Sequence, residues 1–324
     1  MNSKIIVVCS CDDNYVPYCG TMVTSLFENN SNNEVEVNIL SSYISSKNQN
    51  KFKSLAKKYG QKIYIVSIDK EKFSKLPIGD KFTNISIETY FRLNMSRIFN
   101  QHDKVLYLDC DMIIRHDLSE LWNINIEGYA IAAVKDNIYM QQNNIERLGY
   151  PLMDSYYNAG MGLYNLAFLR EVDFEQKVWN FIETNFDKII YHDQDIINAL
   201  CHGLFKDVSV RWNMLDVFLM DDPHIVEENK EDLEQWIENP SIIHYSAKYK
   251  PWNIEGYHQY RDEFWKYVKL SPWNDLKPTR KFKGTERFII DLKFVVKRIL
   301  GIIGFKKYSY RKLHLKDYVP EGLC

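Results

Sequence analysis

The stretch KVLYLDCDMII, residues Lys104–Ile114, decides the fold expected for this chain. Val105–Leu108 is a run of β-branched, aromatic and aliphatic side chains, typical of a strand buried on both faces of a parallel sheet. Two carboxylates, Asp109 and Asp111, follow directly. Ligands of open α/β sheets bind outside the carboxyl ends of the strands, and two such carboxylates can share one hard divalent cation. The stretch therefore predicts a strand running into a metal site, against the alternative of a solvated turn.

The chain before this stretch alternates between strand and helix patterns. Strands are expected at Lys4–Ser10, Val35–Leu40 and Ile63–Ile68, and helices at Tyr18–Phe27 and from Ser46 through Lys58, where Ser46 and Gln49 resemble a capping box. This β-α-β-α-β order predicts a parallel, doubly wound sheet with right-handed crossovers. The first strand also ends in acids, which predicts a second loop facing the ligand. No G-x-G-x-x-G follows that strand and no G-x-x-x-x-G-K-[ST] occurs, so dinucleotide and phosphate-loop fingerprints are absent.

Later segments contribute further polar side chains. After Lys104–Ile114 we expect a helical turn near Leu118–Trp122, a strand at Ala130–Val134 and a helix around Gln141–Leu148. In YYNAGMGLYN, Tyr156–Asn165, the residue Asn158 stands beside two glycines, which indicates close approach of the backbone to a ligand or another strand. In HDQDIIN, His192–Asn198, the side chains of Asp193, Gln194 and Asp195 exceed what an N-cap needs. In SIIHYSAKYKPW, Ser241–Trp252, a strand-like run ends in His244 and Lys250 follows.

Composition sets the remaining limits. A chain of 324 residues with 45% hydrophobic content can form one large or two medium domains, and its net charge of -2 gives no reason to expect nucleic acid as a partner. The six cysteines have neither zinc-site spacing nor the density of a disulfide scaffold, which predicts reduced thiols in a cytosol. Cys9 and Cys11 are interpreted as small core residues. The apolar run at the N-terminus is interpreted as a first strand and not as a signal peptide.

Six segments in order carry a resemblance to glycosyltransferase family 8, the group containing glycogenin and bacterial lipopolysaccharide and lipooligosaccharide glucosyl- and galactosyltransferases. They are DDNY at Asp12–Tyr15, ETYFRL with Arg92, LDCDMI with Asp109 and Asp111, YNAG at Tyr157–Gly160, DQDIINA at Asp193–Ala199, and His244 with KPW at Lys250–Trp252. The similarity spans about residues 4 to 265. It implies a GT-A type α/β fold with a doubly wound mixed sheet, a UDP-hexose donor, a Mn²⁺ ion with Mg²⁺ as the alternative, and retention of anomeric configuration.

The resemblance also implies roles for individual residues. The metal ligands are Asp109, Asp111 and His244, a mixture of oxygen and nitrogen donors that favours Mn²⁺. The catalytic set is Asp109, Asp111, Asp193, Gln194 and Lys250, in which Lys250 and the dication stabilise the departing diphosphate. Uracil and ribose are bound by Ser10, Asp12, Asn14 and Tyr15, and the sugar hydroxyls by Arg92, Asn158, Ala159, Asp193 and Gln194, while Cys110 and Ala247 complete the donor site. Front-face substitution is the usual proposal for such enzymes, and Gln194 is not assigned as a nucleophile.

One residue departs from the family pattern His-x-x-Gly-x-x-Lys-Pro-Trp, because Ala247 stands where that pattern has glycine. If the backbone there must be left-handed, alanine costs on the order of 1 kcal/mol. We therefore expect a small displacement of the diphosphate loop and only a weak backbone contact from Ala247.

The C-terminal segment differs in composition, and a boundary near Lys277 divides a catalytic domain, 1–276, from a tail, 277–324. Between Arg280 and Lys316 there are twelve Lys or Arg and two acids, with apolar residues at helical spacing. Charges interrupt every apolar run, so a transmembrane span is excluded. The pattern predicts an in-plane amphipathic anchor on an anionic membrane, and hence a cytoplasmic, peripherally membrane-associated enzyme acting on a lipid-linked or lipopolysaccharide-type saccharide acceptor. The alternative is a helix packed on the catalytic domain with its basic face solvated.

Two other functions remain open at this stage. A haloacid-dehalogenase-type phosphatase also has a strand ending in Asp-x-Asp, but that motif normally lies on the first strand of its domain and carries Thr or Val where this chain has Ile113. The other is a catalytically inactive GT-A-fold binding protein at the membrane. The complete set of Asp109, Asp111, His244 and Lys250 weighs against it.

Overall fold

The computed structural model describes residues 4–78, 85–219, 230–247, 250–254, 256, 258–280 and 296. The strands of this part are β1 (Lys4–Ser10), β2 (Glu34–Ser41), β3 (Lys62–Ser67), β4 (Lys104–Leu108), β5 (Met112–Ile114), β6 (Ile131–Lys135), β7 (Tyr157–Asn165), β8 (Phe205–Asp207), β9 (Met214–Leu215) and β10 (Ile242–His244). The α-helices are α1 (Val16–Asn29), α2 (Ser46–Tyr59), α3 (Met95–Ile98), α4 (Ser119–Trp122), α5 (Gln142–Leu148), α6 (Leu166–Glu171), α7 (Phe174–Asn185), α8 (His192–Cys201), α9 (Lys230–Glu238) and α10 (Arg261–Leu270).

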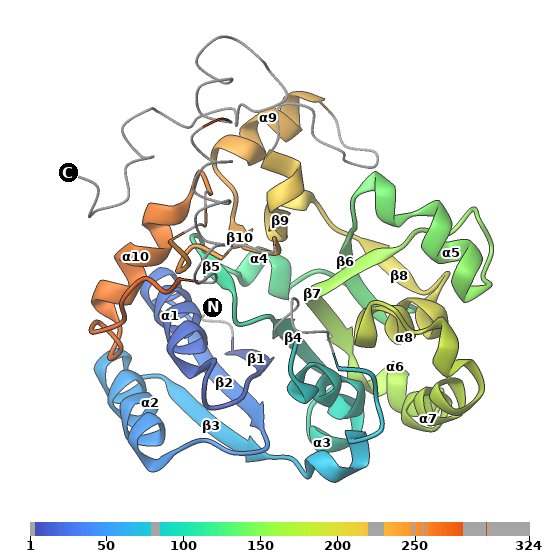
Figure 1. Cartoon of the computed structure of the whole chain (residues 1–324), viewed down its shortest axis with the longest axis horizontal. Coiled ribbons are helices and arrows are strands. Elements are labelled where there is room, and N and C mark those ends of the chain that lie inside the picture. The colour runs from blue at the N-terminus through green and yellow to red at the C-terminus, as the bar shows by residue number, and fades with distance from the viewer. Residues whose placement is uncertain are drawn as a thin grey trace.

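The main sheet has the strand order β3-β2-β1-β4-β7-β6-β8 (Figure 1). Strands β3, β2, β1 and β4 are parallel, as the alternating sequence pattern predicts. Strand β7 is antiparallel to both of its neighbours, β4 and β6, so the sheet is mixed. Because β7 runs the opposite way, its first residues lie beside the carboxyl ends of β4 and β6. This places the YNAG segment at the same edge of the sheet as Asp109.

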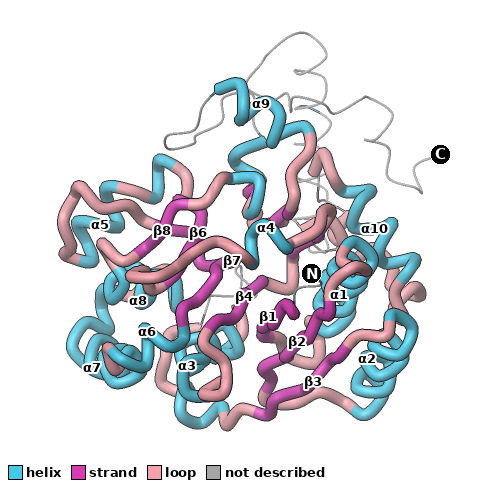
Figure 2. The backbone as a smooth tube through the Cα atoms, turned by 180° about the vertical axis from the view of Figure 1, so that it is seen from behind, coloured by secondary structure: helices cyan, strands magenta, loops and turns pink. Residues whose placement is uncertain are grey.

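Helices cover both faces of this sheet (Figures 1 and 2). Alternate residues of a strand point to opposite faces, and in β1 the side chains of Val7 and Cys9 pack with α1 and α2, whereas Ile6 and Val8 pack with α6, α7 and α8. Both sets of side chains are at most 3% exposed. Two apolar cores on one sheet explain why the strands have near-continuous hydrophobic sequences.

A smaller sheet, with the order β5-β10-β9, stands against the end of the main sheet. The expected strand at Lys104 ends at Leu108, and the chain turns through Asp109–Asp111 before β5 begins in the second sheet. Strand β10 is antiparallel to β5, with His244 opposite Met112. The turn with the two carboxylates therefore connects the two sheets and lies beside the histidine.

The expected capping box at Ser46 and Gln49 is wrong by one residue. The N-cap of α2 is Ser45, which has an extended backbone and accepts a hydrogen bond from the Asn48 amide. Ser46 is already helical, and the Gln49 side chain donates to the Ile44 carbonyl instead. Adjacent serines at a helix start give sequence reasoning no means of choosing between them.

The C-terminal part of the described chain packs onto helices α1 and α2 through Trp273. Its side chain is 3% exposed, and its indole nitrogen donates to Asn48 of α2. The ring lies so close to α1 that a Cβ on Gly20 would be 2.1 Å from it. Further along, Thr279 exchanges backbone hydrogen bonds with Trp252 and Ile254. The chain thus contacts the catalytic fold at least as far as Thr279.

The predicted amphipathic tail lies almost wholly outside the described residues, so its helix and the boundary near Lys277 stay predictions. Among the described residues, no helix has the length and apolar character needed to cross a bilayer.

Replacing Trp273 by alanine tests whether this segment belongs to the core. We expect Trp273→Ala to lower the free energy of unfolding by about 3–5 kcal/mol, because it removes a buried aromatic ring and leaves a cavity between α1 and α2. Tyr43→Ala is the control, since that ring is 67% exposed, and its effect should be within about 0.5 kcal/mol. Urea unfolding of both variants measures the difference. A loss below about 1 kcal/mol for Trp273→Ala would show that the segment is dispensable for the core.

Candidate active site

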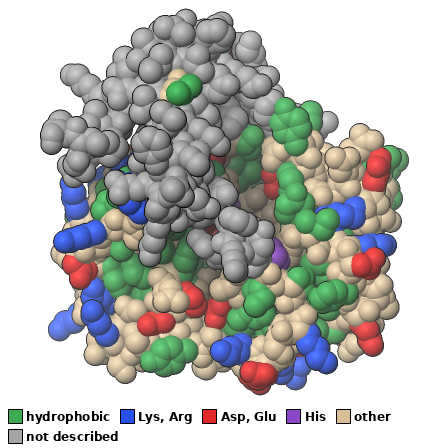
Figure 3. Space-filling model, viewed as in Figure 1, with side chains coloured by type: hydrophobic (Ala, Val, Ile, Leu, Met, Phe, Trp, Pro, Cys, Tyr) green, Lys and Arg blue, Asp and Glu red, His purple; other side chains and the backbone are tan. Residues whose placement is uncertain are grey.

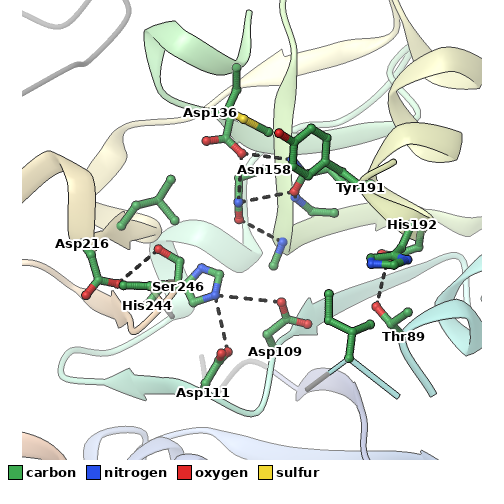
Figure 4. Close-up of a pocket in the computed structure, with 18 of the residues that line it drawn as sticks. Thr89, Asp109, Asp111, Asp136, Asn158, Tyr191, His192, Asp216, His244 and Ser246 are labelled. Atoms are coloured by element: carbon green, nitrogen blue, oxygen red, sulfur yellow. Dashed lines mark hydrogen bonds and ion pairs between the residues drawn. The ribbon is translucent and has the colours of Figure 1, made fainter. Parts of the chain in front are cut away.

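A cavity of about 690 Å³ opens where the two sheets meet, within the usual size range of small-ligand sites. It is lined by the turn after β4, the first residues of β7, the start of α8, and the ends of β9 and β10 (Figure 4). Of the residues assigned from the sequence, eleven line it: Tyr15, Arg92, Asp109, Asp111, Asn158, Ala159, Asp193, Gln194, His244, Ala247 and Lys250. Among them, Ala247 is the residue that departs from the family pattern.

Asp109, Asp111 and His244 converge in this cavity, and one ligand atom from each lies within 4.8 Å of the others. His244 Nε2 is 3.4 Å from Asp111 Oδ1 and 3.9 Å from Asp109 Oδ2. Two carboxylates and an imidazole form a donor set suited to a divalent cation such as Mn²⁺ or Zn²⁺. The geometry thus brings His244 to the two aspartates, from which it is far apart in the sequence.

Asn213 orients the histidine of this group. Its Oδ1 lies 2.8 Å from His244 Nδ1, and its amide nitrogen donates to Asn158 Oδ1 at 2.9 Å. Asn213 Oδ1 can accept the Nδ1 proton, an arrangement that leaves Nε2 facing the two carboxylates. Asn213 is fully buried, so this arrangement is held rigidly. The imidazole is therefore prepared to act as a nitrogen ligand.

Gly160 leaves the room that the group needs. A Cβ built on Gly160 would lie 2.4 Å from His244 Cε1 and 2.9 Å from Asp109 Oδ2. Any side chain here would push the histidine and the aspartate out of place. The close approach predicted from the glycines of YYNAGMG is thus confirmed, and it is an approach of the backbone to the candidate metal ligands.

The two carboxylates have different electrostatic environments. Burial raises the pKa of Asp109 to about 6, although the Arg92 guanidinium acts in the opposite direction. Burial also opposes ionisation of Asp111, but Lys250 and His244 outweigh it and hold the pKa of Asp111 below its usual range. Lys250 Nζ is 2.8 Å from Asp111 Oδ2. A divalent cation between the two aspartates would favour the charged form of both.

Arg92 connects the turn to helix α8. Its Nη2 is 2.7 Å from Asp109 Oδ1, its Nε is 2.9 Å from Asp193 Oδ2, and its Nη1 donates to the Ala159 carbonyl. The other oxygen of Asp193 accepts the Thr89 hydroxyl proton at 2.6 Å. Arg92 and Asp193 are each 5% exposed. Both oxygens of Asp193 are thus already engaged within the protein.

Gln194 belongs to a second network on the far side of the cavity. Its Oε1 accepts the Ala159 amide at 3.0 Å, and its Nε2 donates to Asp136 Oδ2 at 3.0 Å. Asn158 Nδ2 also donates to Asp136, at 3.2 Å. The third polar residue of this helix start, Asp195, is fully buried between Arg147 and Tyr156 and has a structural role.

The loop after β10 is held by a residue that sequence reasoning missed. Asp216 Oδ2 accepts the Ala247 amide at 2.8 Å and the Ser246 hydroxyl at 3.2 Å. Buried His258 presents Nε2 to Asp216 Oδ1 at 3.5 Å, while its Nδ1 accepts the Tyr260 amide. Ala247 is not among the residues with positive φ, so the backbone strain expected from replacing glycine does not arise here.

The loop after β1 contributes one side chain to the cavity, that of Tyr15. Asp12 accepts hydrogen bonds from the Tyr15 amide and from the Asn14 side chain, so it closes a local turn. The Ser10 hydroxyl is buried without a hydrogen-bond partner. Ser10, Asp12 and Asn14 stand at the carboxyl end of β1, as predicted, but they do not line the cavity.

The cavity residues that have no part in the sequence-based assignment include Asp136, His192 and Asp216. Asp136 follows β6 directly, so the rule that identified Asp109 could have found it. His192 begins α8 with a left-handed φ of 52°, a conformation that is strained for a residue other than glycine. Asp216 follows the two-residue strand β9, which is too short for a sequence pattern to reveal.

Several exposed hydrophobic side chains lie close to α5 in the sequence, and one further exposed aromatic residue lines the cavity. They are Ile138 at 53%, Tyr139 at 66%, Leu152 at 59% and Met153 at 91% exposure, with Tyr191 at 42% among the lining residues. Figure 3 shows hydrophobic side chains at several places on this face of the molecule. Exposed apolar side chains near a polar cavity are a feature of many binding regions.

Removing the buried arginine should destabilise the site. We expect Arg92→Met to lower the free energy of unfolding by about 3–5 kcal/mol, because it leaves the buried Asp193 and the partly buried Asp109 without their counter-charge. Arg97→Met is the matched control: its ion pair with Glu175 is exposed, and its loss should cost at most about 1 kcal/mol. Urea unfolding measures both. Equal midpoints for the two variants would contradict the proposed importance of the buried pair.

Comparisons with known proteins identify the family. The family model described as "Glycosyl transferase family 8" matches residues 6–256 of this chain. General stress protein A of Bacillus subtilis is 27% identical over 84% of this chain and 96% of its own length. Lipopolysaccharide 1,2-glucosyltransferase of Escherichia coli is 26% identical over 93% and 89%, and lipopolysaccharide 1,3-galactosyltransferase of Salmonella typhimurium is 25% identical over 84% and 80%.

The fold has a counterpart among solved structures. An active-site mutant of LgtC superimposes with a TM-score of 0.73 at 25% identity, covering 83% of this chain and 96% of that one. This likeness confirms the predicted GT-A type fold. The family match covers the strands, the turn with the two aspartates and the histidine loop. The chain therefore belongs to glycosyl transferase family 8 and is a glycosyltransferase.

Proposed function

We propose that this glycosyltransferase moves a hexose from a UDP-sugar to a saccharide acceptor, with retention of configuration and with a divalent cation, Mn²⁺ in preference to Mg²⁺. The observation that carries the proposal is the convergence of Asp109, Asp111 and His244 within 4.8 Å at the edge of the cavity. The family supplies the reaction class, and the E. coli and Salmonella relatives are named for glucosyl and galactosyl transfer. A UDP-hexose is the donor that agrees both with this reaction class and with the names of these relatives.

The residues of the cavity fit the cation. The imidazole is oriented by Asn213, and Gly160 leaves the necessary space. A bound dication supplies electrostatic stabilisation of the charge that develops on a leaving diphosphate. Lys250 adds a second positive charge there, since its ammonium lies beside Asp111 and the residue lines the same cavity. Its removal should therefore slow departure of the leaving group more than it weakens donor binding.

The opposite wall is suited to the sugar. Arg92 holds Asp193 through its Nε atom, and Gln194 and Asn158 are fixed by Asp136. Because Gln194 Oε1 already accepts the Ala159 amide, it is positioned as a polar neighbour of the sugar and not as a free nucleophile. Uracil and ribose are assigned to Tyr15 and the loop after β1, with the acceptor entering past Tyr191 and the exposed apolar residues near α5.

The metal requirement provides the decisive experiment. We expect Asp111→Asn to lower kcat for UDP-hexose turnover by about 100-fold or more and to abolish Mn²⁺ binding in calorimetry, because the cation loses a charged ligand. Asp187→Asn, at an exposed aspartate, should retain full activity. Circular dichroism and thermal unfolding verify that both variants are folded. Sugar transfer that persists in the presence of a chelator would refute the metal-dependent proposal.

The donor is identified in the same assay. UDP-glucose and UDP-galactose differ only at C4, and the turnover of each is compared under identical conditions. A preference for either agrees with the proposal. Use of neither removes the UDP-hexose assignment, even if the chain binds Mn²⁺.

We further propose that the tail, 277–324, brings the enzyme to a lipid-linked or lipopolysaccharide-type acceptor at an anionic membrane. The support is the sequence itself, with twelve Lys or Arg and two acids between Arg280 and Lys316. Each basic residue near an anionic surface contributes about 1 kcal/mol, and each buried methylene about 0.8 kcal/mol.

Liposome co-sedimentation tests the tail. The full chain should bind anionic but not neutral liposomes, and binding should weaken as salt shortens the screening length from about 10 Å at 0.1 M ionic strength. A chain ending at Arg280 keeps the backbone pairing of Thr279, so it should stay folded and turn over the donor but no longer sediment. The full-length double variant Lys297→Gln/Arg298→Gln should bind anionic liposomes more weakly than the wild type. Equal sedimentation of the full and shortened chains would refute the anchor.

A further inference from the structure

Four cysteines that are dispersed in the sequence meet beneath the metal-binding turn. Cys9 lies on β1, Cys11 just after it, Cys19 on α1 and Cys110 between the two aspartates. All four are at most 5% exposed. The sulfurs of Cys9, Cys19 and Cys110 lie within 4.8 Å of one another, and the Sγ atoms of Cys9 and Cys19 are 3.7 Å apart. The spacing of these cysteines along the sequence does not indicate that they form a cluster.

We propose that Cys9, Cys19 and Cys110 form a binding site for a soft d¹⁰ cation of the Zn²⁺ and Cd²⁺ class. Thiolates are the ligands that such ions prefer. Zinc–sulfur bonds of about 2.3 Å in a tetrahedral site place the sulfurs roughly 3.8 Å apart, close to the Cys9–Cys19 separation. Small rearrangements of buried side chains would bring Cys110 to the same distance.

The surroundings fit a thiolate site. Cys11 is buried in the same apolar core as these three cysteines, which makes it a candidate fourth ligand. Cys110 Sγ contacts only one oxygen in the hydrogen-bond network described, the Ser10 carbonyl at 3.3 Å. The cluster is thus rich in sulfur and poor in the oxygen ligands that Mn²⁺ and Mg²⁺ prefer.

The soft site is separate from the candidate Mn²⁺ site. Asp109 and Asp111 line the cavity, whereas Cys110 does not. Binding exchanges the sulfur-bound protons for bonds to the cation, the protons pass to solvent, and nothing is oxidised or reduced. An occupied site would tie β1 and α1 to the turn that carries the two aspartates, and should therefore raise the thermal stability of the chain.

Simple core packing is the competing explanation, because a free cysteine also behaves as a small hydrophobic residue. The two explanations differ in their response to a thiophilic metal. The reduced full-length chain is titrated with Cd²⁺ in the presence of excess Mg²⁺ and incubated long enough for local opening to expose the buried thiols. We expect an ultraviolet sulfur-to-cadmium charge-transfer band that saturates at one ion per chain, together with a rise in Tm. Carboxylate and imidazole ligands give no such band.

Substitutions assign the band to the cluster. Cys19→Ala should abolish the band. Cys19→Val removes the same thiol but fills more of the core volume, so it provides the test if the alanine variant does not fold. Cys201→Ala, at a buried cysteine of α8, and Cys324→Ala are matched controls that should retain the band. Absence of the band in the wild type, its persistence in both Cys19 variants, or its loss in a control would overturn the proposal. None of these outcomes depends on sugar transfer, so they are independent of the proposed function.

Discussion

The backbone of the Asp109–Asp111 turn is fixed from two sides, and the rest of the site depends on this constraint. The Asp109 amide donates to the Gly160 carbonyl of β7 at 2.8 Å, and the Asp111 carbonyl accepts the Tyr245 amide just after β10 at 3.0 Å. The first bond continues the main sheet and the second continues the small sheet. Because both partners belong to strands or directly follow one, the two carboxylates stand where the sheets meet, and any shift of one sheet against the other would move the candidate metal ligands.

Buried charge is the energetic cost of this arrangement. Arg92 and Asp193 are nearly inaccessible to solvent, and taking ions out of water costs several kcal/mol each unless partners offset it. For Arg92 the partners are two carboxylates and two carbonyls. Asp111 has Lys250, while burial leaves Asp109 with a raised pKa. A well-packed apolar cluster would be more stable, so the charges indicate a site shaped for an ionic ligand and not for stability.

The sequence predicted the positions of those site residues that directly follow a recognisable strand. The apolar run before Asp109 indicates where a strand stops, and parallel strands bring such ends to one edge. It could not show that β7 runs antiparallel, because strand direction depends on the crossover and not on residue pattern. Asn213 and Asp216 flank a strand of two residues, which has no detectable period. The strain expected at Ala247 was an inference from a family glycine, whereas the backbone conformation here is set by Asp216.

The tripeptide Asp109-Cys110-Asp111 shows how a short turn can present different chemistries to its two sides. The carboxylates reach the cavity, and the thiol between them points toward Ser10, Cys9 and Cys19 in the core. Hard cations prefer oxygen ligands and soft cations prefer sulfur ligands. Adjacent residues of this turn can therefore bind different classes of cation. The same backbone that positions the aspartates thus also positions Cys110. A change in how the sulfurs pack beneath the turn would therefore act on the same backbone that holds the two carboxylates in the cavity.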